Sequence, residues 1–162
     1  MKEMKAWLLI AAALTLFGAL PVRGTDVAEL LPARVLTVSR DGTEYRIKSD
    51  NGSEGRGGSI ELALADLRRT AEGTLYLGTV EQVIVSASAW DALAGLVSGT
   101  KLRPAAKLYY AFETPDAAQA QAFLEAHPGS LTLGKARALL LTGQTVRAPR
   151  IIEEDGRLRL GE

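Results

Sequence analysis

The middle of the chain decides the fold, and residues 59–99 read SIELALADLRRTAEGTLYLGTVEQVIVSASAWDALAGLVSG. Residues 80–85 are a short apolar run, which indicates a strand buried on both faces at the centre of a sheet. Ser88 predicts the N-cap of a helix over 89–97, which Ser98-Gly99 ends. Ser59 predicts another N-cap, and the residues after it are apolar at helical spacing until Gly73: Ile60, Leu62, Ala63, Leu64 and Leu67.

A hairpin is predicted on the N-terminal side of this stretch. Residues 33–39 and 43–49 are rich in Val, Thr, Tyr and Ile, and Arg40-Asp41-Gly42 separates them. Asp-Gly between two such runs is a strong hairpin signal. The next residues, 50–58, read DNGSEGRGG and contain four glycines, which predicts a mobile loop.

A third core strand is predicted on the C-terminal side, over residues 105–112. Thr114 then offers an N-cap with Pro115 at the first helical position, which predicts a helix over 115–126. His127-Pro128-Gly129 ends that helix.

A shorter helix over 133–141 follows, with Thr132 as its cap and Gly143 at its end. Two short strands, at 150–153 and 157–160, enclose a second Asp-Gly turn at Glu154-Asp155-Gly156. The predicted order is therefore β-β-α-β-α-β-α-α-β-β. Helices that alternate with strands favour a mixed β-sheet with helices packed on it. We expect the α/β (α+β) class and a single domain.

The N-terminal residues have the pattern of a targeting segment. Lys2 and Lys5 precede a mainly apolar run over 6–20, and Val22 and Gly24 occupy the −3 and −1 positions of a cleavage site. Residues 1–24 therefore predict a secretory signal peptide. The alternative is an uncleaved N-terminal anchor, for which the uncharged run of 17 residues over 6–22 is short, because a spanning helix needs roughly 17–25.

Composition excludes several classes. The chain has 162 residues, with 19 basic and 19 acidic side chains, so it lacks the basic field of a nucleic-acid-binding protein. With 47% hydrophobic residues it also lacks the signature of disorder. There is no Cys, which excludes a disulfide framework and a thiolate metal site. We expect residues 25–162 to form one exported domain with no cofactor.

No set of residues predicts catalysis. His127 is the single histidine, and in His-Pro-Gly at a helix end it more commonly contacts the terminal carbonyls than acts as a base. No G-x-S-x-G occurs. The acidic run Glu153-Glu154-Asp155 is at a hairpin tip, where charges are usually solvated. Trp90 and the pair Tyr109-Tyr110 can line a pocket, but aromatic residues in such elements more often belong to the core. We therefore expect no enzyme.

The glycine-rich residues 52–58 precede a predicted helix N-terminus, where backbone amides can bind an anion. They lack the Lys-Ser/Thr ending of a P-loop and the spacing of G-x-G-x-x-G. A flexible connector is the preferred interpretation, with anion binding as the alternative.

Two segments together carry a family resemblance. Residues 54–67, EGRGGSIELALADL, and residues 75–85, LYLGTVEQVIV, resemble the N-terminal domain of the spore germination Ger(x)C (GerAC-like) proteins. The strand and turn at 35–42, Arg103 before the strand over 107–112, and the ending at 149–158 are also similar to that family.

The resemblance implies a non-enzymatic component of the nutrient germinant receptor. In that family the C subunit is a lipoprotein at the outer face of the spore inner membrane, beside integral-membrane A and B subunits. Partners would then be the membrane subunits of a germinant receptor, and the N-terminal segment alone would place this chain near the membrane.

This sequence departs from the family pattern at two places. Arg23-Gly24-Thr25 stands where the lipobox Gly-Cys is expected, so a lipid anchor does not carry over. The sequence stops at Glu162, where family members continue, which suggests an isolated first domain. The alternative function is a secreted α/β binding module for a small ligand or an envelope polymer, using the glycine loop and the neighbouring strand ends.

Overall fold

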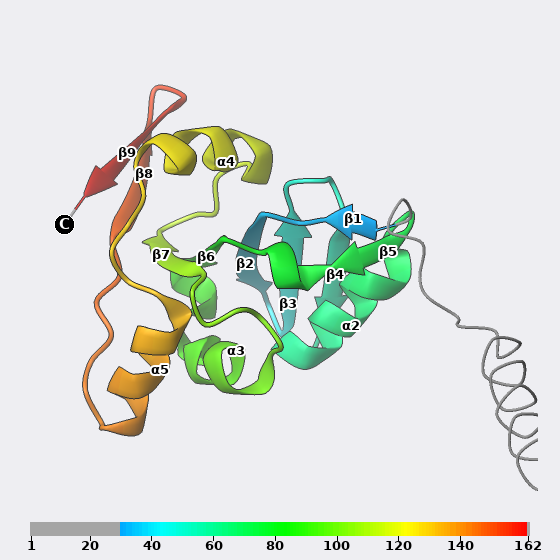
Figure 1. Cartoon of the computed structure of the whole chain (residues 1–162), viewed down its shortest axis with the longest axis horizontal. Coiled ribbons are helices and arrows are strands. Elements are labelled where there is room, and N and C mark those ends of the chain that lie inside the picture. The colour runs from blue at the N-terminus through cyan, green and yellow to red at the C-terminus, as the bar shows by residue number, and fades with distance from the viewer. Residues whose placement is uncertain (1–29, 162) are drawn as a thin grey trace, which may run out of the picture.

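Seven strands form one mixed sheet in the computed structural model, which describes residues 30–161 (Figure 1). Its order is β4-β3-β2-β6-β7-β8-β9. The strands are β2 (Val35–Asp41), β3 (Glu44–Ser49), β4 (Glu54–Gly57), β6 (Gln82–Ser86), β7 (Lys107–Ala111), β8 (Arg150–Glu154) and β9 (Arg157–Gly161). Strands β2, β6, β7 and β8 are parallel, and β3, β4 and β9 continue the sheet antiparallel. The predicted signal segment, 1–24, lies outside the described residues.

Helices cover both faces of this sheet. They are α2 (Ile60–Thr70), α3 (Leu93–Gly99), α4 (Ala117–Ala126) and α5 (Leu133–Leu141), with short 3₁₀ turns η2 (Leu77–Thr79) and η3 (Ala87–Ala92). Side chains of α2, α3 and α5 belong to the larger hydrophobic core, and α4 packs into a smaller core on the opposite face (Figure 1). The α/β class, with helices on a mixed sheet in a single domain, is confirmed.

Strand β6 lies at the centre of the sheet, as predicted. All five of its residues are buried. Val83 and Val85 pack into the larger core, whereas Ile84 packs into the smaller one. A strand with a helix layer on each face loses the polar alternation of a half-exposed strand, and this explains the continuous apolar run.

A small parallel sheet of two strands was not predicted. It pairs β1 (Leu30–Pro32) with β5 (Thr74–Tyr76). Each strand has three residues, too few for a period-2 pattern to be recognised in the sequence.

Both predicted hairpins are present. In the first, Asp41 pairs with Glu44, so the two-residue loop begins at Gly42, two residues later than the predicted connection at Arg40. Gly42 has φ +58°, which fits the glycine preference at the first central position of a type II′ turn. In the second, Asp155 and Gly156 have φ of +51° and +71°, the two positive values of a type I′ turn.

The prediction of a mobile loop over 50–58 is wrong for residues 54–57. These residues form β4, which pairs with β3 and lies against α2. A Cβ on Gly55 would overlap the backbone N of Leu67, and a Cβ on Gly57 would lie 2.6 Å from the backbone N of Ala63. The glycines therefore allow a helix and a strand to approach closely, a role that composition alone does not distinguish from flexibility.

Two of the predicted helix caps are confirmed. Ser59 Oγ accepts a hydrogen bond from the N–H of Leu62 at the start of α2. Thr132 Oγ1 accepts one from the N–H of Lys135 at the start of α5. Leu62, predicted to be on the apolar face of its helix, is 60% exposed.

The other two predicted caps are wrong. Ser88 Oγ accepts a hydrogen bond from the N–H of Arg40, and the chain around it forms η3, so α3 starts later at Leu93. Asp116, rather than Thr114, caps α4, because its Oδ1 accepts from two backbone N–H groups, each at 3.0 Å. A carboxylate also interacts favourably with the positive end of the helix.

Candidate functional site

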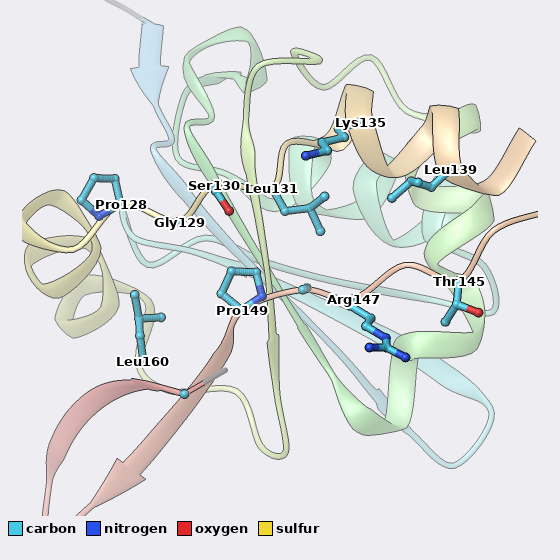
Figure 2. Close-up of a pocket in the computed structure, with 12 residues that line it drawn as sticks. Pro128, Gly129, Ser130, Leu131, Lys135, Leu139, Thr145, Arg147, Pro149 and Leu160 are labelled. Carbon is cyan, nitrogen blue, oxygen red and sulfur yellow. The ribbon is translucent and has the colours of Figure 1, made fainter. Parts of the chain in front are cut away.

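A groove of about 630 Å³ lies at the amino end of β8 (Figure 2). We call it the α5 groove. Its walls are α5, the loop that follows α4, the extended segment 145–149 and the last residues of β9. It therefore brings together parts of the chain that the sequence pattern did not connect.

Apolar side chains form much of the groove surface. Leu131 is buried, Leu139 is half-buried and Leu160 is 37% exposed. Pro128 and Pro149 complete this surface near the end of β9 (Figure 2). The groove can therefore bury an apolar group of a ligand or partner.

Two cations line the groove from different walls. Lys135 projects from α5 and Arg147 from the segment that returns to β8, with Leu131 between them in Figure 2. Both side chains are exposed, and within residues 30–161 neither forms an ion pair. Among residues 30–161, no acidic residue lines the groove. Its charge is therefore positive and available to an anion.

The sequence contains the cause of this charge. Residues 126–152 include Lys135, Arg137, Arg147 and Arg150 but no Asp or Glu. Balanced overall charge concealed this stretch, because the acidic residues lie elsewhere in the chain. A scan of charge along the chain, rather than in total, identifies it.

The start of α5 is fully engaged within the fold. The N–H of Leu133 donates to the carbonyl of Ala106 and that of Gly134 to the carbonyl of Pro104, at 2.8 and 2.9 Å. The N–H of Lys135 donates to Thr132 Oγ1. The side chains of Lys135 and Arg147, rather than the helix amides, are therefore the donors that an anion in the groove would meet.

The end of α5 sets the position of Arg147. Gly143 has φ +69°, and the N–H of Gln144 donates to the carbonyl of Leu139 at 2.8 Å, so the chain reverses there. Val146 is buried and anchors the returning segment, while Thr145 and Arg147 on either side line the groove.

The groove lining suits binding and has no acid–base pair. Ser130 and Thr145 supply hydroxyl groups, but in the described part of the chain no His, Asp, Glu or Cys lines the groove beside them. Activation of a hydroxyl nucleophile requires an adjacent base. The arrangement can hold an anion that also carries an apolar group.

The glycine-rich segment that sequence analysis considered for anion binding is occupied by the protein itself. The N–H of Arg56 donates to Asp66 Oδ2 at 2.9 Å, and Thr70 Oγ1 donates to the carbonyl of Glu54 at 2.7 Å. The pKa of Asp66 lies below its usual value, first because of the bond from the Arg56 N–H and second because of Arg69. Helix α2 therefore binds the backbone of residues 54 and 56, and these groups are not free for a ligand.

Glu54 is the centre of a surface ion-pair cluster. Burial raises the pKa of Glu54. The hydrogen bond from Arg56 and the charges of Lys48, Arg56 and Arg46 together lower the pKa by more, so that it lies below its usual value. The Arg56 guanidinium lies 2.8 Å from Glu54 Oε1. The carboxylate is thus engaged in structural contacts.

His127 lies at the end of α4, as predicted. Its Nδ1 is 3.1 Å from the carbonyl oxygen of Phe123, and its ring stacks on the Phe123 ring with centroids 4.7 Å apart. Because a carbonyl oxygen accepts, Nδ1 carries the hydrogen in this contact. The predicted interaction with the terminal carbonyls is confirmed.

The aromatic candidates lie in or against the core. Tyr109 is fully buried, and Trp90 packs edge-on against Tyr110 with ring centroids 5.2 Å apart. None of the three lines the α5 groove. The core assignment is confirmed for Tyr109 and for Trp90, which packs against the larger core, while Tyr110 is half-buried beside Trp90.

The acidic run at the C-terminal hairpin is exposed. Glu154 pairs with Arg159 at 2.7 Å across the turn. Within residues 30–161 no group of three or more His, Asp or Glu side chains is placed to hold a metal ion. In the same range no helix is long and apolar enough to cross a membrane.

Comparisons with known proteins identify no relative whose functional residues could be compared with those of this chain. No protein-family model matches the chain, and neither a curated protein nor a solved structure matches it.

Proposed function

We propose that the chain is an exported, non-enzymatic domain that acts by protein–protein contact at the outer face of a membrane. Its partners would be membrane subunits of a nutrient germinant receptor. The resemblance to Ger(x)C proteins supports this proposal, because the residues that carry it form one structural unit. Residues 54–67 are β4 and α2, held together through Gly55 and Gly57, and 75–85 lead from β5 into β6.

The observation that carries the proposal is the α5 groove. It combines an apolar surface with Lys135 and Arg147, and the described residues add no acidic side chain to its lining. Protein contact surfaces use apolar contacts for affinity and charges for orientation and selection of the partner. Within residues 30–161 no general base accompanies the hydroxyls of the groove, so the chemistry of the described lining favours contact.

The second candidate is a secreted module for a small ligand or an envelope polymer. The concave groove and its two unpaired cations support an anionic ligand of that kind. Within the glycine segment, the Arg56 N–H and the Glu54 carbonyl are not free for such a ligand, because α2 binds them.

Affinity purification of the full tagged chain from sporulating and vegetative cells tests the first candidate. We expect a receptor subunit among the partners identified by mass spectrometry. The double variant Lys135→Glu, Arg147→Glu should lose that partner. Arg68→Glu is the matched control, because Arg68 is an exposed cation at the end of α2 without an ion pair in the described structure.

A deletion strain gives the second readout. We expect slower nutrient-triggered germination than in the parent strain. Normal germination with no receptor subunit among the partners would overturn the first candidate. Binding of the parent chain, but not the groove variant, to isolated anionic envelope polymer would then support the second. Turnover of general esterase, glycosidase, peptidase or phosphatase substrates by purified protein would contradict both.

A further inference from the structure

The outer edge of β9 has backbone groups that no other strand uses. Glu154 pairs with Arg157 across the two-residue turn, so Arg157, Arg159 and Gly161 direct their N–H and C=O groups toward β8. The same groups of Leu158 and Leu160 then point away from the sheet. Within residues 30–161 these groups have no backbone partner. The edge is therefore open to another strand.

The opposite edge of the sheet is closed by side chains of α2. Strand β4 is the edge strand there. Its outward N–H at Arg56 donates to Asp66, and its outward carbonyl at Glu54 accepts from Thr70. Side chains of α2 thus bind two outward backbone groups of β4, whereas within residues 30–161 the outward groups of β9 have no backbone partner.

The two faces of β9 differ in chemistry. Arg157 and Arg159 lie on one face and Leu158 and Leu160 on the other, because successive strand residues alternate. Leu158 is buried in the core beneath α4, and Leu160 is 37% exposed beside it. In a strand added here, the side chains on one face would lie next to the arginines, and those on the other face would lie next to the leucines.

The arginine face carries an excess of positive charge. Arg159 is paired with Glu154. Arg157 has no ion pair within residues 30–161, and neither does Arg150, which lies opposite Gly161 on the same face. Acidic side chains on an added strand would complement this face, since opposite charges on neighbouring strands stabilise the pair.

A second copy of the chain is a poor occupant of this edge. Antiparallel pairing of two β9 strands would place Arg157 and Arg159 next to the arginines of the other copy. Like charges directly opposite each other destabilise a sheet. The repulsion between these arginines therefore favours a partner protein of different sequence over a second copy of the chain.

We propose that β9 binds an extended segment of a partner protein as an additional strand, and that this segment alternates acidic and apolar side chains. Strand addition uses backbone hydrogen bonds for affinity and alternate side chains for specificity. The inference rests on the proposed function of protein contact, for which it supplies the surface and the chemistry of the partner.

The probe is a synthetic peptide of about seven residues in which Asp and Val alternate, a length typical of one strand. Hydrogen exchange of the full chain, followed by NMR, measures protection of single amides. We expect the peptide to slow exchange at Leu158 and Leu160 by about tenfold or more at saturation. A peptide in which Lys replaces Asp should give no protection. Equal protection by both peptides would overturn the acidic preference.

The variant Leu160→Pro removes one outward N–H without removing a bond to β8, because proline is tolerated where a strand N–H faces solvent. We expect it to lower peptide affinity at least about tenfold while the denaturation midpoint stays close to that of the parent. Leu62→Ala changes another exposed leucine, on α2, and should leave binding unchanged. If Leu160→Pro unfolds the chain, the reversal Arg157→Glu tests the same face without a backbone change and should abolish the preference for the acidic peptide, because it cancels the excess positive charge.

The outcomes separate this inference from the proposed function. A receptor subunit that still binds the Leu160→Pro and Arg157→Glu variants would overturn the inference and leave the proposed function standing. If the peptide protects Leu158 and Leu160 but no receptor subunit is captured, the result would support strand addition at β9 and contradict the proposal that the partner is a germinant receptor. Loss of peptide binding in Lys135→Glu but not in Leu160→Pro would place the peptide in the α5 groove and overturn strand addition.

Discussion

The backbone N–H of Gly129 donates a 2.8 Å hydrogen bond to the phenolic oxygen of Tyr109. Tyr109 is fully buried in β7, and Gly129 belongs to the loop that lines the α5 groove. A Cβ on Gly129 would lie 2.8 Å from Cε1 of the tyrosine ring. Tyr109 in β7 therefore holds the loop at Gly129, and with it one wall of the α5 groove, in position.

Replacement of Tyr109 by Phe should destabilise the domain by about 1–3 kcal/mol, because the Gly129 N–H loses its partner in a partly buried position. Denaturant unfolding measures the change. Tyr110→Phe is the matched control, since the described structure gives that hydroxyl no hydrogen bond, and it should be nearly neutral. Equal stability of Tyr109→Phe and the parent would contradict a structural role of this bond.

The same tyrosine predicts a loss of stability at alkaline pH. Burial raises the pKa of Tyr109, and the hydrogen bond from Gly129 opposes this only in part. The folded state therefore keeps the proton at pH values where the unfolded chain releases it. The stabilisation is complete below the unfolded pKa of about 10 and is lost as pH rises toward the folded value. Unfolding curves from pH 8 to 11 should show a steeper decline for the parent than for Tyr109→Phe; parallel declines would contradict the shift.

Gly55→Ala should be strongly destabilising, because the added methyl group meets the backbone of Leu67 and Ala63 rather than a movable side chain. Overpacking of this kind costs about 1–3 kcal/mol or more. Gly58→Ala is the control three residues away, where nothing lies within 4 Å of the new atom. Its stability should stay within about 0.5 kcal/mol of the parent. Similar midpoints for both variants would mean that α2 is not in contact with β4.

Ile84→Ala should cost about 2–5 kcal/mol, because it removes a fully buried side chain and leaves a cavity between β6 and α4. Ile152→Ala is the comparison within the same sheet, at a half-buried position, and should cost less. Thermal or denaturant melts measure both. If Ile84→Ala left the free energy of unfolding unchanged, Ile84 would not be buried and β6 would not be the central strand.

The sequence predicted those elements whose signals are local and strong. The central strand over 80–85, the Ser59 and Thr132 caps and the Asp155-Gly156 turn are all present, because each depends on periodicity or on one hydrogen bond near in sequence. The wrong predictions depended on tertiary contacts. Ser88 serves as acceptor for Arg40, a residue far away in the chain.

The glycine segment shows the same limit most clearly. Glycine permits flexibility and close packing equally, and the choice between them depends on what lies above the strand. Here α2 lies above it. No pattern within residues 50–58 contains that information.

The candidate groove could have been predicted only in part. The absence of acidic residues from 126–152 is visible in the sequence and indicates a positive surface. That Lys135 and Arg147 line the same groove as Leu160 follows from the return of the chain through Gly143 to β8, which brings residues from three elements together. This arrangement depends on how the elements are connected in three dimensions, which the spacing of residues in the sequence does not indicate.

The order in which the strands join the sheet has a consequence for folding kinetics. Strands β2, β3 and β4 and helix α2 are consecutive between Val35 and Thr70 and are joined by short turns. Strand β8 pairs with β7 only after the chain has passed over both faces of the sheet through α4 and α5. Local contacts close with less loss of chain entropy than distant ones. We therefore expect the N-terminal half to nucleate folding, and β7 to be a transient edge, exposed to misassembly, until the last hairpin docks.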